Sequence, residues 1–131
     1  MDVFTVKTNQ RIEMLDITSN VRKAIADSNV RDGICCVFMP HTTAAVTINE
    51  NADPDVPRDI LMELKKIVPL DDGYRHTEGN SDAHIKATLV GASVFIIVEE
   101  GRPALGTWQS VFFCEFDGPR SRKVWVKVMK P

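Results

Sequence analysis

Two short runs of this chain are apolar at nearly every position, and they restrict the fold more than any other feature. The runs are ICCVFM at residues 34–39 and SVFIIV at residues 93–98. Successive side chains of a strand point to opposite faces of its sheet, so strands without polar alternation need cover on both faces. In a chain of 131 residues, this predicts either a sandwich of sheets or burial against other subunits.

Five other short runs also have the composition of strands. In the last of them, valine occupies every second position from residue 124 to residue 128, which predicts one inward and one outward face. The five predicted strands are residues 3–8, 13–17, 44–49, 108–116 and 123–129. Together with two to three short helices, they predict one α+β domain over residues 1–131, with β-sheets in a sandwich-like arrangement.

The first predicted helix has Thr18 or Ser19 as its cap and ends before Gly33. Apolar residues follow at i, i+3 and i+4 from Val21, which gives the helix one inward side. A third, shorter helix is predicted in DAHIKATLVG, residues 82–91, with Asp82 near its start and Gly91 after its end.

The second predicted helix has its apolar residues at helical spacing between Val56 and Val68. We predict Asp55 as its cap, because Pro57 then falls in the first turn, where a missing N–H group costs little. Asp53 precedes a proline and is expected to be extended, with a carboxylate that the cap does not need.

Charge and hydropathy exclude several classes of function. The formal charge is -2 and no long run of either sign occurs, so no nucleic-acid partner is expected. No apolar run approaches the ~20 residues of a membrane helix, and the first residues lack a signal sequence, so we expect a cytoplasmic protein with no membrane partner. The three cysteines are interpreted as buried packing residues.

All three histidines lie between residues 41 and 84, each beside polar or acidic residues. Taken alone, each is most simply a surface or hydrogen-bonded histidine. Taken together, His41, His76 and His84 suit a zinc-type site or a general acid–base site, because imidazole is both a common metal ligand and a proton carrier near neutral pH. Their spacing does not match an HExxH helix, so it does not choose between the two.

The stretch EGNSDAH, residues 78–84, combines flexible residues with an expected helix start. Gly79 and Asn80 can adopt unusual backbone angles, and the N–H groups of the helix start favour phosphate or another anion. A plain loop with a helix cap explains the stretch equally well. The cations that could neutralise a bound anion are Arg75, Lys86 and Arg102.

The stretch HTTAAVTINENADPDVPRDI, residues 41–60, places polar groups at both ends of a predicted strand. His41 stands at one end, and Glu50, Asn51 and Asp53 stand at the other. A straight strand would separate His41 from residue 49 by about 26 Å, at ~3.3 Å per residue. The two ends therefore serve different pockets unless the chain turns back or another subunit completes the site.

A glycine-containing turn is predicted in EEGRPALGTWQS, residues 99–110. Trp108 is interpreted as a core residue of the strand that follows this turn. Arg102 and Gln109 stand at the two ends of the turn and remain candidates for a pocket.

Three motifs carry a resemblance to a known family. They are HTTAAVTINENADPDVPRD, EGNSDAHIKA and GRPALGTWQSVFFCEFDGPR, in this order. The chain resembles the YjbQ-like family, also described as secondary thiamine-phosphate synthases, from about residue 4 to residue 129. The resemblance implies a homotrimer in which β-sheets pack around a threefold axis, which would cover strands that are apolar on both faces.

The resemblance also implies a weak synthase activity, in which a hydroxymethylpyrimidine diphosphate is joined to a thiazole phosphate with release of pyrophosphate. We infer catalytic roles within the matching motifs for His41, His76, His84, Glu50 and Asp53. We infer phosphate- or substrate-binding roles for Asn51, Gly79, Asn80, Ser81, Asp82, Lys86, Arg102 and Gln109. A divalent metal, Zn or Mg, would be held by the three histidines or by the carboxylates of Glu50, Asp53 and Asp82.

The same residues suit two other kinds of protein. A metal-dependent hydrolase of a small phosphorylated metabolite would use imidazoles to hold zinc and a carboxylate to activate water. A non-catalytic trimer would bind its ligand without converting it.

Overall fold

The computed structural model describes residues 1–131, whose eight strands form two antiparallel sheets. The larger sheet has the order β1 (Asp2–Lys7), β8 (Ser121–Met129), β3 (Gly33–Phe38), β5 (Ser93–Glu99) and β6 (Arg102–Pro103). The smaller sheet has the order β2 (Glu13–Asp16), β7 (Gln109–Glu115) and β4 (Ala44–Glu50). The seven strands expected from the sequence are therefore present, and the short β6 is additional.

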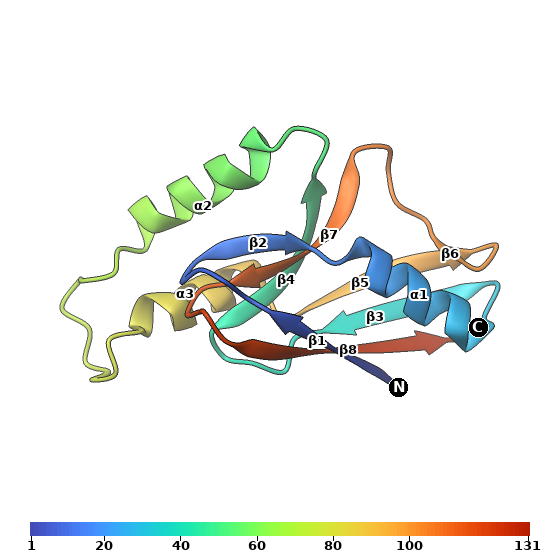
Figure 1. Ribbon diagram of the computed structural model, residues 1–131, viewed down its shortest axis with the longest axis horizontal. Helices are drawn as coiled ribbons and strands as arrows, with labels where there is room; N and C mark the ends of the chain where they lie inside the picture. The colour runs from blue at the N-terminus through green and yellow to red at the C-terminus, as the bar shows by residue number, and fades with distance from the viewer.

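Three helices complete the domain: α1 (Thr18–Ser28), α2 (Asp55–Ile67) and α3 (Ser81–Val90). The smaller sheet and α1 lie over one face of the larger sheet, and α3 lies against the other face of the smaller sheet (Figure 1). The predicted α+β fold with packed sheets and two to three helices is thus confirmed, as a layered arrangement of helices, small sheet and large sheet.

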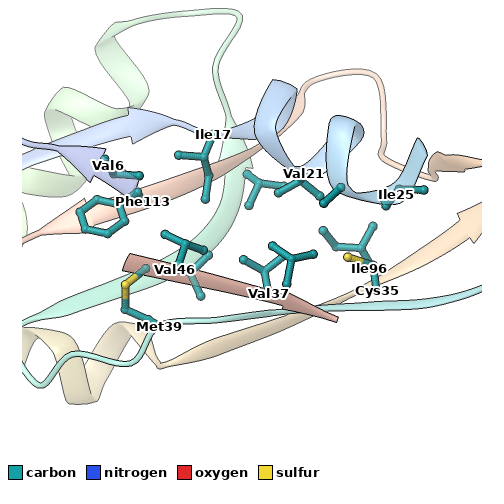
Figure 2. Close-up of a cluster of buried hydrophobic side chains, with 14 of the residues drawn as sticks. Val6, Ile17, Val21, Ile25, Cys35, Val37, Met39, Val46, Ile96 and Phe113 are labelled. Carbon is teal, nitrogen blue, oxygen red and sulfur yellow. The ribbon is translucent and has the colours of Figure 1, made fainter. Parts of the chain in front are cut away.

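The main core fills the space between the two sheets. Ile17, Val21 and Ile25 approach from the side of β2 and α1, and Cys35 and Val37 approach from the larger sheet (Figure 2). All five side chains are buried. Burial of apolar surface contributes roughly 25 cal/mol per Å², so this layer is a main source of the free energy of folding.

A second core lies between the smaller sheet and the helices. Phe112 and Cys114 of β7 point away from the main core and pack with Ala83 and Ala87 of α3. Leu61 of α2 packs against the edge of this cluster. Both faces of the smaller sheet are therefore covered within one chain, and α3 is fixed on the sheet by its small residues.

The larger sheet is covered on only one face. In β5 and β3, Ile96, Val98, Cys35 and Val37 face the core, whereas the alternate residues face away from it. The apolar side chains left exposed on this outer face are Val3, Ile34, Phe38, Phe95, Ile97, Trp125 and Met129. The sequence requirement for cover on both faces is therefore unmet by the single chain.

The starts of two helices differ from the prediction. Helix α1 already includes Thr18, and Asp16 accepts a hydrogen bond from the Thr18 backbone N–H at 2.9 Å, so neither Thr18 nor Ser19 is the cap. Helix α2 begins at Asp55 after Pro54, and the Asp53 carboxylate accepts the Asp55 N–H at 2.9 Å. Asp53 thus supports the helix start, contrary to prediction, because a short carboxylate two residues before a free N–H can bend back to accept it.

The interpretation of Trp108 as a core residue is also wrong. Its side chain is 63 % exposed, because the strand begins one residue later and Trp108 stays in the preceding turn. Cys35 and Cys114 are buried as expected, and burial raises the pKa values of their thiols to about 11 and about 12. Cys36 is only half-buried, on the opposite face from Cys35. None of the three helices has both the length and the apolar composition that would let it cross a membrane.

Candidate functional site

Two of the three histidines meet at the start of α3. The rings of His76, in the preceding loop, and His84, in the first turns of the helix, pack edge to face with their centroids 5.4 Å apart. His76 Nε2 lies 3.7 Å from a carboxylate oxygen of Glu78. The pair opens into a pocket of about 340 Å³ whose other lining residues are Tyr74, Arg75, Ser81 and Ile85.

The helix start beside this pocket is not closed by a side-chain cap. Gly79 has a φ of +77°, which a side chain would strain, and Asn80 directs its amide nitrogen to Asp117 at 2.8 Å. Asn80 consequently makes no side-chain capping hydrogen bond. Its backbone carbonyl accepts the Ala83 N–H at 3.0 Å, which leaves the N–H groups of Ser81 and Asp82 without an acceptor in the chain. The Asn80 Oδ1 atom is buried without a hydrogen-bond donor, although buried polar atoms nearly always have a partner.

Asp82 and Lys86 lie on another side of α3 from the histidine pair. Lys86 Nζ donates to Asp82 Oδ2 at 2.9 Å, and Arg11 donates to Asp82 Oδ1 at 3.0 Å. Burial alone would raise the pKa of the Asp82 carboxyl, but the hydrogen bonds from Arg11 and Lys86 outweigh it and hold the pKa below its usual value. Asp82 therefore stays ionised and anchors the loop that carries Arg11 to α3.

His41 is outside the histidine pair, in the loop between β3 and β4. Its Nε2 accepts the backbone N–H of Lys123 at 2.9 Å, which requires a neutral ring with its proton on Nδ1. Burial, followed by the positive charge of Arg122, lowers the pKa of His41 below its ordinary value. At neutral pH the His41 ring is thus a proton acceptor already engaged by the backbone.

Next to His41 lies a buried ion pair that sequence reasoning missed. Arg122 donates to both carboxylate oxygens of Glu115, and the contact between Nε and Oε1 is 3.0 Å. Thr8 donates to the same carboxylate at 2.8 Å, and Thr43 accepts from Arg122 at 2.8 Å. Two signals pointed to this cluster: Glu115 interrupts an apolar strand, and Arg122 is in phase with the inward valines of β8.

The other acidic and amide candidates gather at the far end of the smaller sheet. Glu50 is paired with Gln109 across β4 and β7, and Asn51 donates from its side chain to Asp16 at 2.8 Å. Gln109 accepts the Gly106 N–H at 2.8 Å, which shapes the turn before β7. Because His41 precedes β4 and Glu50 ends it, the two ends of the polar stretch are separated by the whole strand, and within one chain they do not share a pocket.

Arg102 lies on β6 at the edge of the larger sheet, in a different pocket from the histidine pair. No group of three or more histidine, cysteine, aspartate or glutamate side chains is arranged within the chain to hold a metal ion. His76 and His84 therefore offer at most a partial ligand set. A divalent metal stays a prediction.

Comparison with known proteins gives a consistent family. A model of the UPF0047 proteins that are YjbQ-like matches residues 2–131. The UPF0047 protein MJ1081 of Methanocaldococcus jannaschii is 53 % identical over 126 residues, which cover 96 % of this chain and 91 % of that protein. The UPF0047 protein YugU of Bacillus subtilis is 49 % identical over 125 residues, which cover 95 % of each chain.

Solved structures show the same fold. The crystal structure of a YjbQ/UPF0047 protein from Clostridium acetobutylicum superimposes with a TM-score of 0.97 at 55 % identity, covering 98 % of this chain and all of that chain. A YbjQ-like protein of unknown function from Sulfolobus solfataricus superimposes with a TM-score of 0.93 at 35 % identity, covering 97 % and 94 % of the two chains. The family model and both kinds of relative agree, and the chain belongs to the YjbQ-like UPF0047 family.

Proposed function

We propose that this protein is a weak thiamine-phosphate synthase, a transferase that joins a hydroxymethylpyrimidine diphosphate to a thiazole phosphate. The proposal starts from the resemblance of its three motifs to that family. One observation of the structure supports it most: the imidazoles of His76 and His84 lie at 5.4 Å beside the uncapped start of α3. A proton-carrying pair next to a phosphate-binding helix end suits a reaction that expels pyrophosphate.

The phosphate would be bound mainly by backbone groups. The N–H groups of Ser81 and Asp82 and the positive end of the helix dipole would favour an anion at this position. Ser81 adds a hydroxyl group, and Arg75 adds a positive charge to the lining of the same pocket. These groups would neutralise the charge that develops on the diphosphate when its C–O bond breaks and it leaves with the electron pair.

The histidines would handle protons during the transfer. One imidazole would accept a proton, and the other would donate a proton to the leaving oxygen. Asn80 Oδ1 is buried and Asn80 does not line this pocket, so the proton transfers would rest on the two imidazoles.

We further propose that the outer face of the larger sheet packs against other copies of the chain, as the homotrimer of the resemblance would require. Seven apolar side chains are exposed there, among them Phe95 at 67 % and Ile97 at 61 %. Extended apolar patches on a protein surface mark interaction sites. A second copy of the chain would bury the outer face of these strands, which are apolar on both faces of the sheet.

This association bears on the third histidine. His41 is separate from the pair within one chain, so a site with all three imidazoles would need residues from two subunits. The hydrolase alternative depends on such a combined site, because a catalytic zinc needs three protein ligands. The synthase proposal needs only the pair and the start of α3.

The test is an assay of purified protein with the two phosphorylated substrates, in which thiamine phosphate is measured by chromatography. We expect slow product formation that is lost when the imidazoles of the pair are replaced. A lysine-to-glutamine change at Lys23, whose side chain is 77 % exposed on α1, serves as the matched surface control. Absence of product with metal-replete protein, together with failure to rescue a synthase-deficient strain, would reject the proposal.

The same assay separates the alternatives. Release of inorganic phosphate that chelators abolish would favour the hydrolase. Binding of either substrate without any product would favour the non-catalytic trimer.

A further inference from the structure

A second pocket lies under α2, on the side of α3 that faces away from the histidine pair. It encloses about 550 Å³, a volume in the range of small-molecule sites. The lining residues come from α2, α3, the segment before β2 and the segment after α2: Arg11, Ile12, Arg58, Leu61, Met62, Lys65, Leu70, Asp82 and Lys86. It shares no residue with the pocket of His76 and His84.

The charges of this pocket are unbalanced. Four cations and one carboxylate line it, so its formal charge is +3, whereas the whole chain carries -2. Asp82 is the only acidic residue, and both Arg11 and Lys86 pair with it. One carboxylate is thus the counter-ion of two cations. The site is partly buried, and an unpaired charge there costs free energy.

Lys86 is the cation of this pocket with the least access to water. Its side chain is 2 % exposed, and its ammonium group donates one hydrogen bond, to Asp82 Oδ2. An ammonium has three donors, and water cannot reach a side chain this deeply buried as freely as it reaches a surface lysine. The other two donors of Lys86 have no partner in the chain, and Lys86 is one of the residues that line the pocket.

The wall contributed by α2 has a regular pattern. Arg58, Leu61, Met62 and Lys65 follow one another at i, i+3, i+4 and i+7, which places them on one side of the helix. The two cations of this row form no ion pair with any carboxylate of the chain. The apolar residues between them form, with Ile12 and Leu70, an apolar surface that has Arg58 and Lys65 at its two ends.

From this combination we infer that the pocket binds a small organic phosphate with an apolar body. The phosphate would lie toward Lys86 and Arg11 and would restore the charge balance around Asp82. The apolar body would pack on Ile12, Leu61 and Met62, and Arg58 and Lys65 would face the outer end of the ligand. This site is independent of the proposed synthase reaction, which uses the opposite side of α3.

The test uses phenyl phosphate as a probe and the intact wild-type protein. NMR titration of the backbone amides should show saturable shifts along residues 58–65 and 82–86, with smaller effects at His76. Because much of the attraction is electrostatic, the apparent Kd should increase with salt concentration. Phenol and inorganic phosphate should each bind more weakly than phenyl phosphate, because phenol lacks the phosphate group and inorganic phosphate lacks the apolar ring.

The decisive variant is Arg58→Gln with Lys65→Gln. Both residues lie on the outer helix α2 and form no ion pair, so their replacement should leave the fold intact. We expect the Kd for phenyl phosphate to rise about fivefold to tenfold, from the loss of two solvent-exposed charges. Lys23→Gln, a loss of positive charge outside the pocket, should leave it unchanged.

A second variant, Met62→Gln, removes apolar surface without changing charge, and it should weaken phenyl phosphate but not inorganic phosphate. Unsaturable shifts, or a Kd that is unaffected by both the double variant and Met62→Gln, would overturn the inference. Shifts centred on His76 and His84 instead would assign the probe to the other pocket and would also overturn it. Loss of synthase activity in the assay proposed for the histidine pair would leave this result untouched.

Discussion

Arg122 and Glu115 join the two sheets of this protein through a buried ion pair. Glu115 ends β7 of the smaller sheet, and Arg122 lies near the start of β8 in the larger sheet. Their side chains are 0 % and 3 % exposed, and the arginine bonds both carboxylate oxygens. Burial alone would raise the pKa of Glu115, but hydrogen bonds from Arg122, the Asp117 N–H and Thr8 hold it below the usual value.

Removing one partner of this pair should destabilise the protein strongly. We expect Glu115→Gln to lower the free energy of unfolding by about 3–5 kcal/mol, because the charge of Arg122 would remain buried without a counter-ion. Chemical denaturation measures the change. Lys23→Met breaks an exposed pair with Asp27 and should cost less than about 1 kcal/mol. Equal effects of the two substitutions would contradict this reading of the pair.

His41 should make stability depend on pH in a defined direction. The folded state holds the ring neutral, so its pKa is lowered relative to the unfolded chain, whose value is near ~6.5. The contribution of His41 to the free energy of unfolding is therefore complete above the unfolded-state pKa. It is lost as the pH falls from that value toward the folded-state pKa. NMR titration of the ring should give a midpoint below 6.5. In His41→Gln this part of the pH dependence should disappear, and a titration midpoint above the ordinary value would refute the assignment.

The histidine pair should control the proposed reaction. We expect His84→Gln to lower kcat by about 10²- to 10⁴-fold, the usual contribution of a positioned acid or base, with a smaller effect on KM. His84 is partly exposed on α3, so the fold should persist, and circular dichroism verifies this. Full activity of both His84→Gln and His76→Gln would remove the pair from the mechanism.

The outer face of the larger sheet should determine the oligomeric state. We expect the wild-type protein to sediment as a trimer and Phe95→Lys to sediment as a monomer, because a lysine there would be buried in the interface. Phe95 is 67 % exposed in the single chain, so the substitution should have little effect on the fold of that chain. Leu89→Lys replaces a residue that is 60 % exposed on α3 and serves as the control. A monomeric wild-type protein would contradict the proposal directly.

Asp53 offers a way to separate a structural role from a catalytic one. Its carboxylate accepts the Asp55 N–H, so Asp53→Ala should cost about 1 kcal/mol of stability, whereas Asp53→Asn keeps the acceptor and should cost less. If Asp53 is also catalytic, as the sequence predicts, Asp53→Asn should lose activity while keeping its thermal stability. Retained activity in that variant would show that Asp53 has only a structural role, at the start of α2.

The strands were predictable because each depends on a local pattern of side chains. The valines of β8 alternate with exposed residues, and the structure buries Val124 and Val126 as that pattern requires. The helix starts were less predictable, because they depend on single hydrogen bonds. A carboxylate two residues before a free N–H, as at Asp16 and Asp53, competes with the ordinary cap, and composition does not decide between them.

The site was predictable in its residue types but not in its grouping. His76 and His84 are eight residues apart and meet because the intervening turn at Gly79 leads directly into α3. Arg11 carries no sequence signal that relates it to Asp82, because 71 residues separate them. Contacts of that kind follow from how the layers pack, which local patterns do not encode.

Helix α2 has no buried residue, although it is thirteen residues long and covers the pocket lined by Arg11, Lys86 and its own Arg58 and Lys65. It is joined to the rest of the chain by loops at both ends and lies at the outer edge of the layers (Figure 1). Few apolar contacts mean a low free energy of local unfolding, so its amide protons should exchange with solvent earlier than those of β3 or β7. An organic phosphate bound beneath α2 would slow that exchange, and the helix would then report occupancy of the pocket while the sheets stay unchanged.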